Sequence, residues 1–455
     1  MMGRLVSDQR QLFYEFDLEN MVPTEHLLRG IDKFLDLSDL RRHLAPFYSH
    51  TGRPSVDPEL MMRMLIVGYS FGIRSERRLC EEVRLNLAYR WFCRLGLEDE
   101  VPDHSTFSKN RHGRFRDSGL FRHVFEGVLR RCMKEGLVGG EGFAVDASII
   151  TADANRQRGV AGGDPMDWSD PKIATRPVRE YIAALEAEIT PVGKSAKNIS
   201  LTDPASRWTA APGGPAFYAY SANYLIDVDV GIIVDSETTT ARRTEEVEAT
   251  KTMIERTEAR FGLKPDRLAA DTAYGSAPML AWLVEEKAIE PHIPVWDKSA
   301  GKAGLFARSD FIWDKNGDCY ICPGGKRLGT TGRITTENTI LYRARNPDCA
   351  ACTLKPKCCP NTSNRKIARS VHEEARDHAR SLRATPAYRQ SRKDRKKVEM
   401  LFAHLKRILK LDRLRLRGMS GANDELLLAA TAQNLRKMAK LIWRPPKNDG
   451  ITVPA

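Results

Sequence analysis

Short apolar runs that alternate with helical patterns constrain the fold more than any other feature of the sequence. Four of these runs have the length and the β-branched content of strands: 142–150, 224–234, 268–274 and 290–295. The second run turns around Asp229-Val230-Gly231, which indicates a hairpin. Helical patterns at 244–260 and 277–287 separate the later runs. This order predicts an α/β core in which a mixed sheet is flanked by helices.

The rest of the chain divides around this core. Residues 1–135 have mostly helical patterns, and 152–215 form a long loop segment with one expected helix at 177–189. Two further helices are expected at 385–409 and 422–441. We therefore predict a helical N-terminal domain, an α/β domain, an insertion within that domain and a disordered tail, at 1–135, 136–445, 297–370 and 446–455 respectively.

The N-terminal region contains a basic helix. A buried helix at 59–71 is expected before it, and the segment 106–116 then carries several cations close together, among them Lys109 and Arg111. Helix, turn and basic helix suit a module that docks on DNA. The alternative is a helical bundle whose basic face is solvated.

The overall charge also favours a polyanionic partner. The net charge is +13 and the pI about 9.3, and neutralising phosphates releases condensed counterions. The sequence has no apolar run of the roughly 20 residues that span a bilayer, and no signal-peptide pattern at its start. We expect a soluble, cytoplasmic protein with no membrane partner.

Three acids occupy positions where the local pattern calls for an apolar residue. Asp146 lies inside the first apolar run, Asp271 follows the third, and Glu399 lies on the helix at 385–409 among core-facing residues. Burying an unpaired carboxylate is costly, and convergence on a divalent cation removes that cost. Two such ions, about 3.5–4 Å apart, can activate a nucleophile and stabilise a leaving oxygen in phosphodiester attack. Each acid taken singly could instead be a cap or a turn residue.

Six of the nine cysteines crowd into residues 319–359, which in a reducing compartment indicates metal rather than disulfides. Two CxxC pairs, Cys319/Cys322 and Cys349/Cys352, predict a structural zinc site. A small insertion with few aliphatic residues needs a stabilising metal site of this kind, because its apolar core is small. The alternative is a remnant of such a site, or free thiols without metal.

Positive charge is concentrated around Glu399. From Arg376 to Arg417 there are fifteen Lys or Arg residues and four acids, and Arg392 and Lys396 are among those close to Glu399. A charge run is usually a solvated face, but this one flanks a candidate catalytic acid. We predict that these cations bind DNA phosphates and position the scissile bond at the catalytic acids.

Three segments resemble the signature blocks of DDE-type insertion-sequence transposases: AVDAS, AADTAYGS and RKKVEMLFAHLKR. The N-terminal region and the cysteine-bearing insertion resemble one branch of these bacterial enzymes. The resemblance implies a ribonuclease-H-like catalytic domain in which Asp146, Asp271 and Glu399 hold Mg²⁺ or Mn²⁺. Arg395 and Lys406 match the basic residues that this family places four before and seven after the Glu.

The resemblance also bears on the other residues. The family often has a Tyr three residues before that Arg, whereas this chain has Arg392 there and Tyr388 out of register. The CP-x-G and C-x2-C-x5-C pattern of the branch selects one zinc ligand set: Cys322, Cys349, Cys352 and Cys358. The double CxxC alternative uses Cys319 in place of Cys358, and Cys359 is spare in either set.

We therefore expect a DNA transposase that cleaves at terminal inverted repeats and transfers strands into target DNA, as a homodimer on double-stranded DNA. In this interpretation residues 1–135 bind DNA and 136–445 carry catalysis. The competing hypotheses are an inactive or domesticated DNA-binding descendant, a nuclease or resolvase on the same fold, and a zinc-ribbon transcription factor.

Overall fold

The computed structural model describes ten stretches of the chain: 16–49, 51–52, 55–162, 164, 166–168, 170, 172–187, 198–210, 213–295 and 304–444. The tail expected at 446–455 and the last two residues of the helix expected at 177–189 lie outside these stretches. Across the part described, helices are too short or too polar to cross a membrane.

The N-terminal region is helical, as predicted. Its elements are α1 (Leu18–Met21), α2 (Leu27–Phe34), α3 (Leu40–Leu44), η1 (Ala45–Phe47), α4 (Pro58–Phe71), α5 (Glu76–Leu85), α6 (Leu87–Phe92), α7 (His104–Asn110), η2 (Arg111–Phe115) and α8 (Leu120–Lys134). Helix α4 is buried over most of its length and ends at Gly72, whose φ is +70°. A Cβ on Gly72 would lie 2.7 Å from the Ile408 carbonyl oxygen, so both the backbone conformation and the close approach require glycine.

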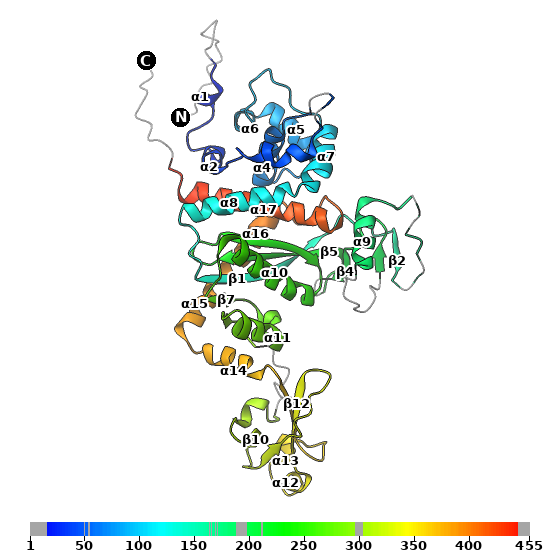
Figure 1. Ribbon diagram of the computed structural model, residues 1–455, viewed down its shortest axis with the longest axis vertical. Helices are drawn as coiled ribbons and strands as arrows, with labels where there is room; N and C mark the ends of the chain where they lie inside the picture. The colour runs from blue at the N-terminus through cyan, green and yellow to red at the C-terminus, as the bar shows by residue number, and fades with distance from the viewer. Residues whose placement is uncertain are drawn as a thin grey trace, which may run out of the picture.

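The central sheet is mixed, as the sequence predicts (Figure 1). Its strands are β1 (Gly142–Thr151), β4 (Arg207–Ala210), β5 (Ala216–Asp227), β6 (Ile233–Thr240), β7 (Arg267–Ala269) and β8 (Glu290–His292). The order is β4-β5-β1-β7-β8, and β6 also pairs with β5. Strands β1, β5 and β6 are antiparallel, whereas β7 and β8 continue from β1 in parallel. This is the ribonuclease-H-like arrangement, with β1 at the centre.

Helices and a small ribbon surround the sheet. They are β2 (Gly159–Ala161), β3 (Asn198–Ser200), α9 (Arg176–Glu186), α10 (Arg243–Phe261), η3 (Thr272–Tyr274), α11 (Ala277–Ala281), η4 (Trp282–Glu286), α14 (Glu373–Leu382), α15 (Pro386–Asp394), α16 (Lys396–Arg407) and α17 (Gly418–Leu441). The single helix expected at 385–409 is two helices that meet at Arg395.

Helix α17 joins the N-terminal helices to the sheet. It packs against α2, α4 and α8 on one side and against β6 on the other (Figure 1). One apolar core therefore extends from Leu28 to Ala439 and includes residues of both regions. The N-terminal helices and the sheet domain, predicted as separate domains, share this core.

The insertion has a core of its own. Strands β9 (Ile312–Asp314), β10 (Cys319–Ile321), β11 (Arg327–Gly329), β12 (Thr339–Ala344) and β13 (Lys366–Ser370) form an antiparallel sheet, accompanied by η5 (Arg308–Asp310), α12 (Asn346–Ala350) and α13 (Lys355–Cys358). Its buried residues are Phe311, Tyr320, Leu328, Tyr342, Ala344, Cys349, Cys359 and Ile367. In Figure 1 it stands at the far end of the molecule from the N-terminal helices. We call the rest of the described chain, 16–295 and 371–444 with the gaps given above, the main body.

Candidate active site

Asp146 projects from the middle of the central strand. In β1 it is paired with Tyr224 of β5, and its side chain is 21% exposed. The carboxylate Oδ1 accepts a hydrogen bond from the backbone N–H of Ala147 at 2.9 Å. The pKa of Asp146 is raised to about 6, chiefly by burial and to a smaller extent by the nearby Asp271 and Glu399 carboxylates, against the opposing effects of the Ala147 amide and Arg395.

Asp271 reaches the same place from the neighbouring strand. Strands β1 and β7 are parallel with Ala144 beside Ala269, and each acid lies two residues further along its chain. Asp271 caps η3, because its Oδ1 accepts the backbone N–H of Ala273 at 2.7 Å. The cap fixes the direction of this carboxylate at the carboxyl end of β7.

Arg395 connects Asp146 to Glu399. Its Nη1 is 3.6 Å from Asp146 Oδ2, and its Nη2 is 2.9 Å from Glu399 Oε1. Arg395 ends α15 and precedes α16, so Glu399 follows on the first turn of α16, with a side chain that is 49% exposed. The structure thus brings together the three acids that the sequence singled out. As they stand, no three or more His, Cys, Asp or Glu side chains in the described stretches are grouped closely enough to hold a metal ion.

Arginines gather beside one of the three acids, Asp271. A cavity of about 400 Å³ beside Asp271 is lined by four of them: Arg383, Arg389, Arg392 and Arg395. Arg383 and Arg389 were not singled out from the sequence, although both belong to the basic run around Glu399. Tyr388 forms part of the wall, 3% exposed, with its ring 5.6 Å from that of His292. The out-of-register tyrosine is therefore a packed wall residue.

Lys406 and Lys396 lie on the same helix as Glu399. Lys406 Nζ donates to the carbonyl oxygen of Ile149 on β1 at 2.9 Å, and burial lowers the pKa of this ammonium group. Because Glu399 also faces β1, the two residues occupy one face of α16, as their spacing predicts. Lys396 is exposed at the first position of the helix.

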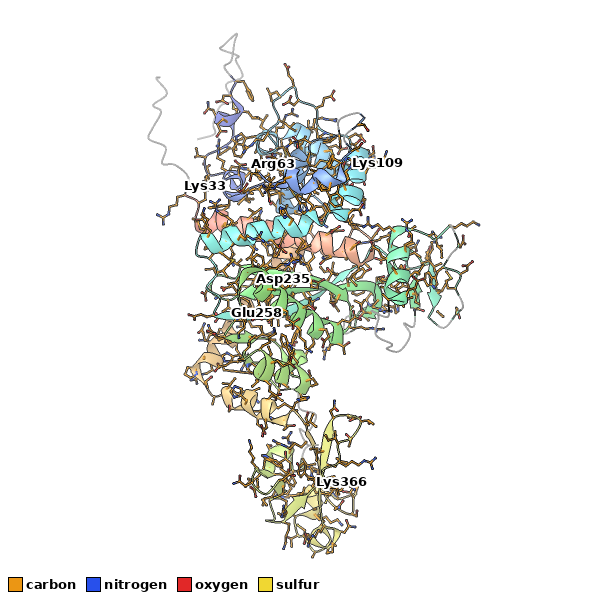
Figure 2. The ribbon with its side chains drawn as sticks, viewed as in Figure 1. Lys33, Arg63, Lys109, Asp235, Glu258 and Lys366 are labelled. Carbon is orange, nitrogen blue, oxygen red and sulfur yellow. The ribbon has the colours of Figure 1, made fainter. Side chains whose placement is uncertain are left out.

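The basic helix of the N-terminal region differs from the expectation. Arg111 is 4% exposed, with its guanidinium bonded to Glu76 at 2.9 Å and to the Tyr69 hydroxyl at 2.7 Å. It cannot reach a DNA surface from this position, so its predicted DNA contact is replaced by a structural role. Lys109, two residues earlier, is exposed (Figure 2).

Some of the cysteine side chains in the insertion lie close to one another. The Cys322 and Cys352 sulfur atoms each lie 3.7 Å from the position that a Cβ on Gly324 would occupy. Burial, and then the adjacent Cys359 thiol, raise the pKa of Cys358 to about 11, and the Cys349 thiol also contributes.

Cys359, spare in both predicted zinc sets, is thus a neighbour of Cys349 and Cys358. Cys319, the ligand of the alternative set, is buried, and its Sγ lies 3.9 Å from Asp314 Oδ2.

Comparisons with known proteins identify transposase segments in the chain. Residues 16–113 match a family model described as a transposase domain (DUF772), and residues 321–439 match one described as a transposase DDE domain. The second range contains Glu399, whereas Asp146 and Asp271 lie between the two ranges.

A cryo-EM structure of a piggyBac transposase synaptic complex with hairpin DNA is similar at 10% identity and a TM-score of 0.32, covering 91% of this chain and 72% of that one. A likeness this weak does not establish a shared fold. No curated protein matches the chain.

Proposed function

We propose that this chain, identified by its two family matches as a DDE-type transposase, cuts DNA at terminal inverted repeats and joins the freed ends to target DNA. The observation that carries the proposal is the approach of three acids from neighbouring elements: Asp146 within β1, Asp271 just after the parallel strand β7, and Glu399 on α16, which Arg395 links to Asp146. Carboxylates gathered from β1, β7 and α16 beside an arginine-lined cavity suit phosphodiester chemistry.

The donor set fits Mg²⁺ or Mn²⁺. All three groups are hard oxygen ligands, and Asp146 carries a pKa raised partly by the other two, so a cation would relieve repulsion already present. Arg395 now provides the positive charge between Asp146 and Glu399. When bound, the metal ions would activate the attacking oxygen and stabilise the leaving one. Asp146 must be ionised to bind them, and Arg395 is placed to turn toward a phosphate once Glu399 is engaged.

The DNA would lie along the arginine-lined side of this site. Arg392 and Arg395 line the cavity, Lys396 is exposed beside it, and Lys406 holds α16 against β1. These cations can neutralise phosphates and fix the scissile bond at the carboxylates. Lys109 would contact the same duplex from the N-terminal helices. Joining two element ends suits a homodimer on double-stranded DNA.

We also propose a structural zinc ion in the insertion, held by Cys322, Cys349, Cys352 and Cys358. Its support is the approach of the Cys322 and Cys352 sulfurs to Gly324 and the closeness of Cys349 to Cys358. The backbone N–H of Lys326 donates to Cys322 Sγ at 3.3 Å, a contact that suits a thiolate. Metal analysis of the purified protein should give one zinc per chain, and a Cys352→Ser variant should lose it. Retention of zinc by that variant would exclude this ligand set.

The central test is a cleavage assay on a labelled duplex that carries the inverted repeats, with Mg²⁺, Mn²⁺ or Ca²⁺ added in turn. Wild type should nick at the repeat boundary, and Glu399→Gln should lower the rate by on the order of 1,000-fold, because one ligand charge is lost. Glu286→Gln, an exposed acid on η4, is the matched control and should cleave normally.

The outcomes separate the competing hypotheses. Specific binding without cleavage in any metal would mean an inactive descendant that only binds DNA. Cleavage without joining to a target duplex would mean a nuclease or resolvase. Cleavage that survives Glu399→Gln would show that the metal-binding role proposed for this acid is wrong.

A further inference from the structure

The insertion sheet has two unlike faces. Residues alternate between the faces along each strand, so Leu328, Tyr342 and Ile367 point into the small core. Their neighbours in sequence point the other way, onto a face that we call the outer face. Strands β11, β12 and β13 contribute Arg327, Arg343 and Lys366 to it, and Arg345 follows β12 in extended conformation.

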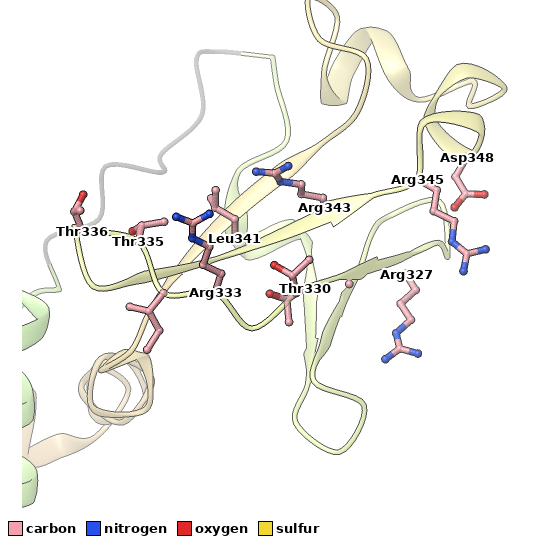
Figure 3. A pocket seen from close by; sticks show the side chains of 12 residues that line it. Arg327, Thr330, Arg333, Thr335, Thr336, Leu341, Arg343, Arg345 and Asp348 are labelled. Carbon is pink, nitrogen blue, oxygen red and sulfur yellow. The ribbon is translucent and has the colours of Figure 1, made fainter.

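The register places these cations side by side. Arg343 is paired with Gly329 on one neighbouring strand and with Lys366 on the other. Arg345 follows Arg343 by two residues, a step of about 6.6 Å along the strand. Arg333 joins them from the loop between β11 and β12, and Figure 3 shows the four arginines spread over the strands and this loop. Figure 2 locates Lys366 in the same region.

The outer-face cations are exposed, and within the described insertion only Arg327 has a partner, the Gly317 carbonyl oxygen at 2.6 Å. In the insertion, described without gaps from residue 304, the side chains of Arg333, Arg343 and Arg345 have neither an ion pair nor a hydrogen bond. Arg369, on the inner face of β13, is by contrast 6% exposed and paired with Asp377. The inward-facing arginine is therefore neutralised within the protein, whereas the unpaired outward-facing arginines are available to bind an anion.

The surroundings favour a large anion with many oxygen atoms. The outer face borders a depression of about 1040 Å³, far wider than a single phosphate. Its lining includes hydroxyl donors at four positions, Thr330, Thr331, Thr335 and Thr336, and a single acid, Asp348. Gly329 is part of its lining, and a Cβ there would meet nothing within 4 Å, so a backbone of another molecule can approach closely.

The lining also distinguishes between nucleic acids. Binding of single strands depends on aromatic side chains that stack on bases. The aromatic residues of this sheet, Trp313, Tyr320 and Tyr342, pack against one another on the inner side. The residues that line the depression include no aromatic side chain, and apart from Gly329, Ile334 and Leu341 they offer charge or hydroxyl groups. This composition suits the phosphates of a duplex, which such groups contact without regard to sequence.

We propose that the outer face of the insertion sheet is a second DNA site, which binds the phosphate backbone of double-stranded DNA independently of sequence and away from the three acids. It rests on the proposed function, because it assumes that DNA is the substrate. It would hold the part of the duplex that extends beyond the cleavage site, so that the element end reaches Asp146, Asp271 and Glu399 in one orientation.

The test compares two charge-matched triple variants of the full chain. Arg333→Ala/Arg343→Ala/Arg345→Ala removes three outer-face cations. Lys134→Ala/Lys264→Ala/Lys357→Ala removes three exposed cations from other surfaces. Fluorescence anisotropy with two labelled duplexes, one of arbitrary sequence and one carrying the inverted repeat, gives the affinity over a range of salt without added divalent metal.

We expect the arginine triple to bind both duplexes at least about tenfold more weakly at ~0.1 M salt, with the slope of log K against log salt shallower by about 2.7, three phosphates at 0.9 each. The lysine triple should change far less. Replacing the same arginines by lysine should restore most of the affinity, since the contact is one of charge. Circular dichroism melting verifies that each variant folds.

Equal binding by the two triples would overturn the proposal, as would a loss confined to the repeat-carrying duplex. The cleavage assay keeps the two proposals apart. If wild type nicks DNA while both triples bind equally, the second site is wrong and the transposase chemistry stands. If the arginine triple alone loses affinity while wild type fails to cleave, the surface stands and the chemistry is wrong.

Discussion

The main body and the insertion are stabilised in different ways. The main body has one apolar core that draws residues from α2 near the start of the chain and from α17 near its end. The insertion encloses eight buried residues from a single stretch, 311–367. The first is therefore expected to unfold as one unit, whereas the second can open locally without disturbing the acids. Precise placement of Asp146, Asp271 and Glu399 depends on the larger core.

The two regions also place their arginines differently. Inside the main body, Arg74 is paired with Glu425, and Arg122 and Arg256 share Asp235. The outer face of the insertion leaves Arg343 and Arg345 unpaired and exposed. Paired cations hold elements together, and unpaired ones are free to bind. A high net charge alone does not distinguish these two uses.

The largest effect on stability is expected from removing a buried charge in the main body. Glu425 is fully buried, pairs with Arg74 and accepts the backbone N–H of Arg415 at 2.6 Å. Glu425→Ala should lower the free energy of unfolding by about 3–5 kcal/mol, because Arg74 is left buried without its partner. Glu425→Gln keeps an acceptor and should lose less. Hydrogen exchange should show protection lost across the main body but kept at β10–β12, and equal loss in both regions would refute separate unfolding.

An intermediate effect is expected at Asp146, with the opposite sign. Its pKa is raised in the folded protein to about 6, from 3.8. Ionisation therefore costs stability, a cost absent below pH 3.8 and complete above about pH 6. In metal-free buffer near pH 7, Asp146→Asn should be more stable than wild type by on the order of 2 kcal/mol, and the difference should vanish below about pH 4.

Denaturant melts of both proteins across this pH range measure the difference. Adding Mg²⁺ should then stabilise wild type more than the variant, since the metal binds the ionised carboxylate. If Asp146→Asn is less stable than wild type at neutral pH, burial of the ionised Asp146 carboxylate does not lower the free energy of unfolding. That result would also argue against the proposal that metal binding relieves an unfavourable ionisation of Asp146.

The smallest effect should be confined to the insertion. The Tyr342 hydroxyl donates to Asp318 Oδ1 at 2.6 Å, and Tyr342→Phe should lose about 1 kcal/mol of local stability. Tyr218→Phe is the matched change in the main body, where the buried hydroxyl makes no hydrogen bond within the described residues, and should be close to neutral. Limited proteolysis should quicken within 304–370 for the first variant only. Faster cleavage throughout the chain would mean that the insertion is coupled to the main body.

Much of the sheet could be predicted from the sequence, because its strands carry their own signals. Apolar runs marked β1, β7 and β8, and the turn at Asp229-Val230-Gly231 marked the hairpin. Strand β5 begins at 216 rather than 224, because it continues through two polar residues: Ser221 and Asn223 are buried through hydrogen bonds to a neighbouring helix and strand. Such partners are invisible in a local pattern.

The site was predictable in its acids and less so in its cations. Each acid interrupts an apolar pattern, whereas a basic helix looks the same whether its arginines face water or a partner. Arg111 reaches Glu76 and Tyr69, 35 and 42 residues away in sequence, and only tertiary packing reveals this. The role of Arg395 as the link between two carboxylates likewise depends on β1 and α16 coming together.

The position of α17 has a consequence for how the protein is made. Helices α2, α4 and α8 pack on residues 418–441, which a ribosome delivers only after the strands of the central sheet and the whole insertion. Until then their apolar faces have no permanent cover, and β6 lacks the helix that closes it. Folding of the main body must therefore wait until α17 has been synthesised, and chains cut short before α17 should be cleared by proteases rather than accumulate as partial DNA binders.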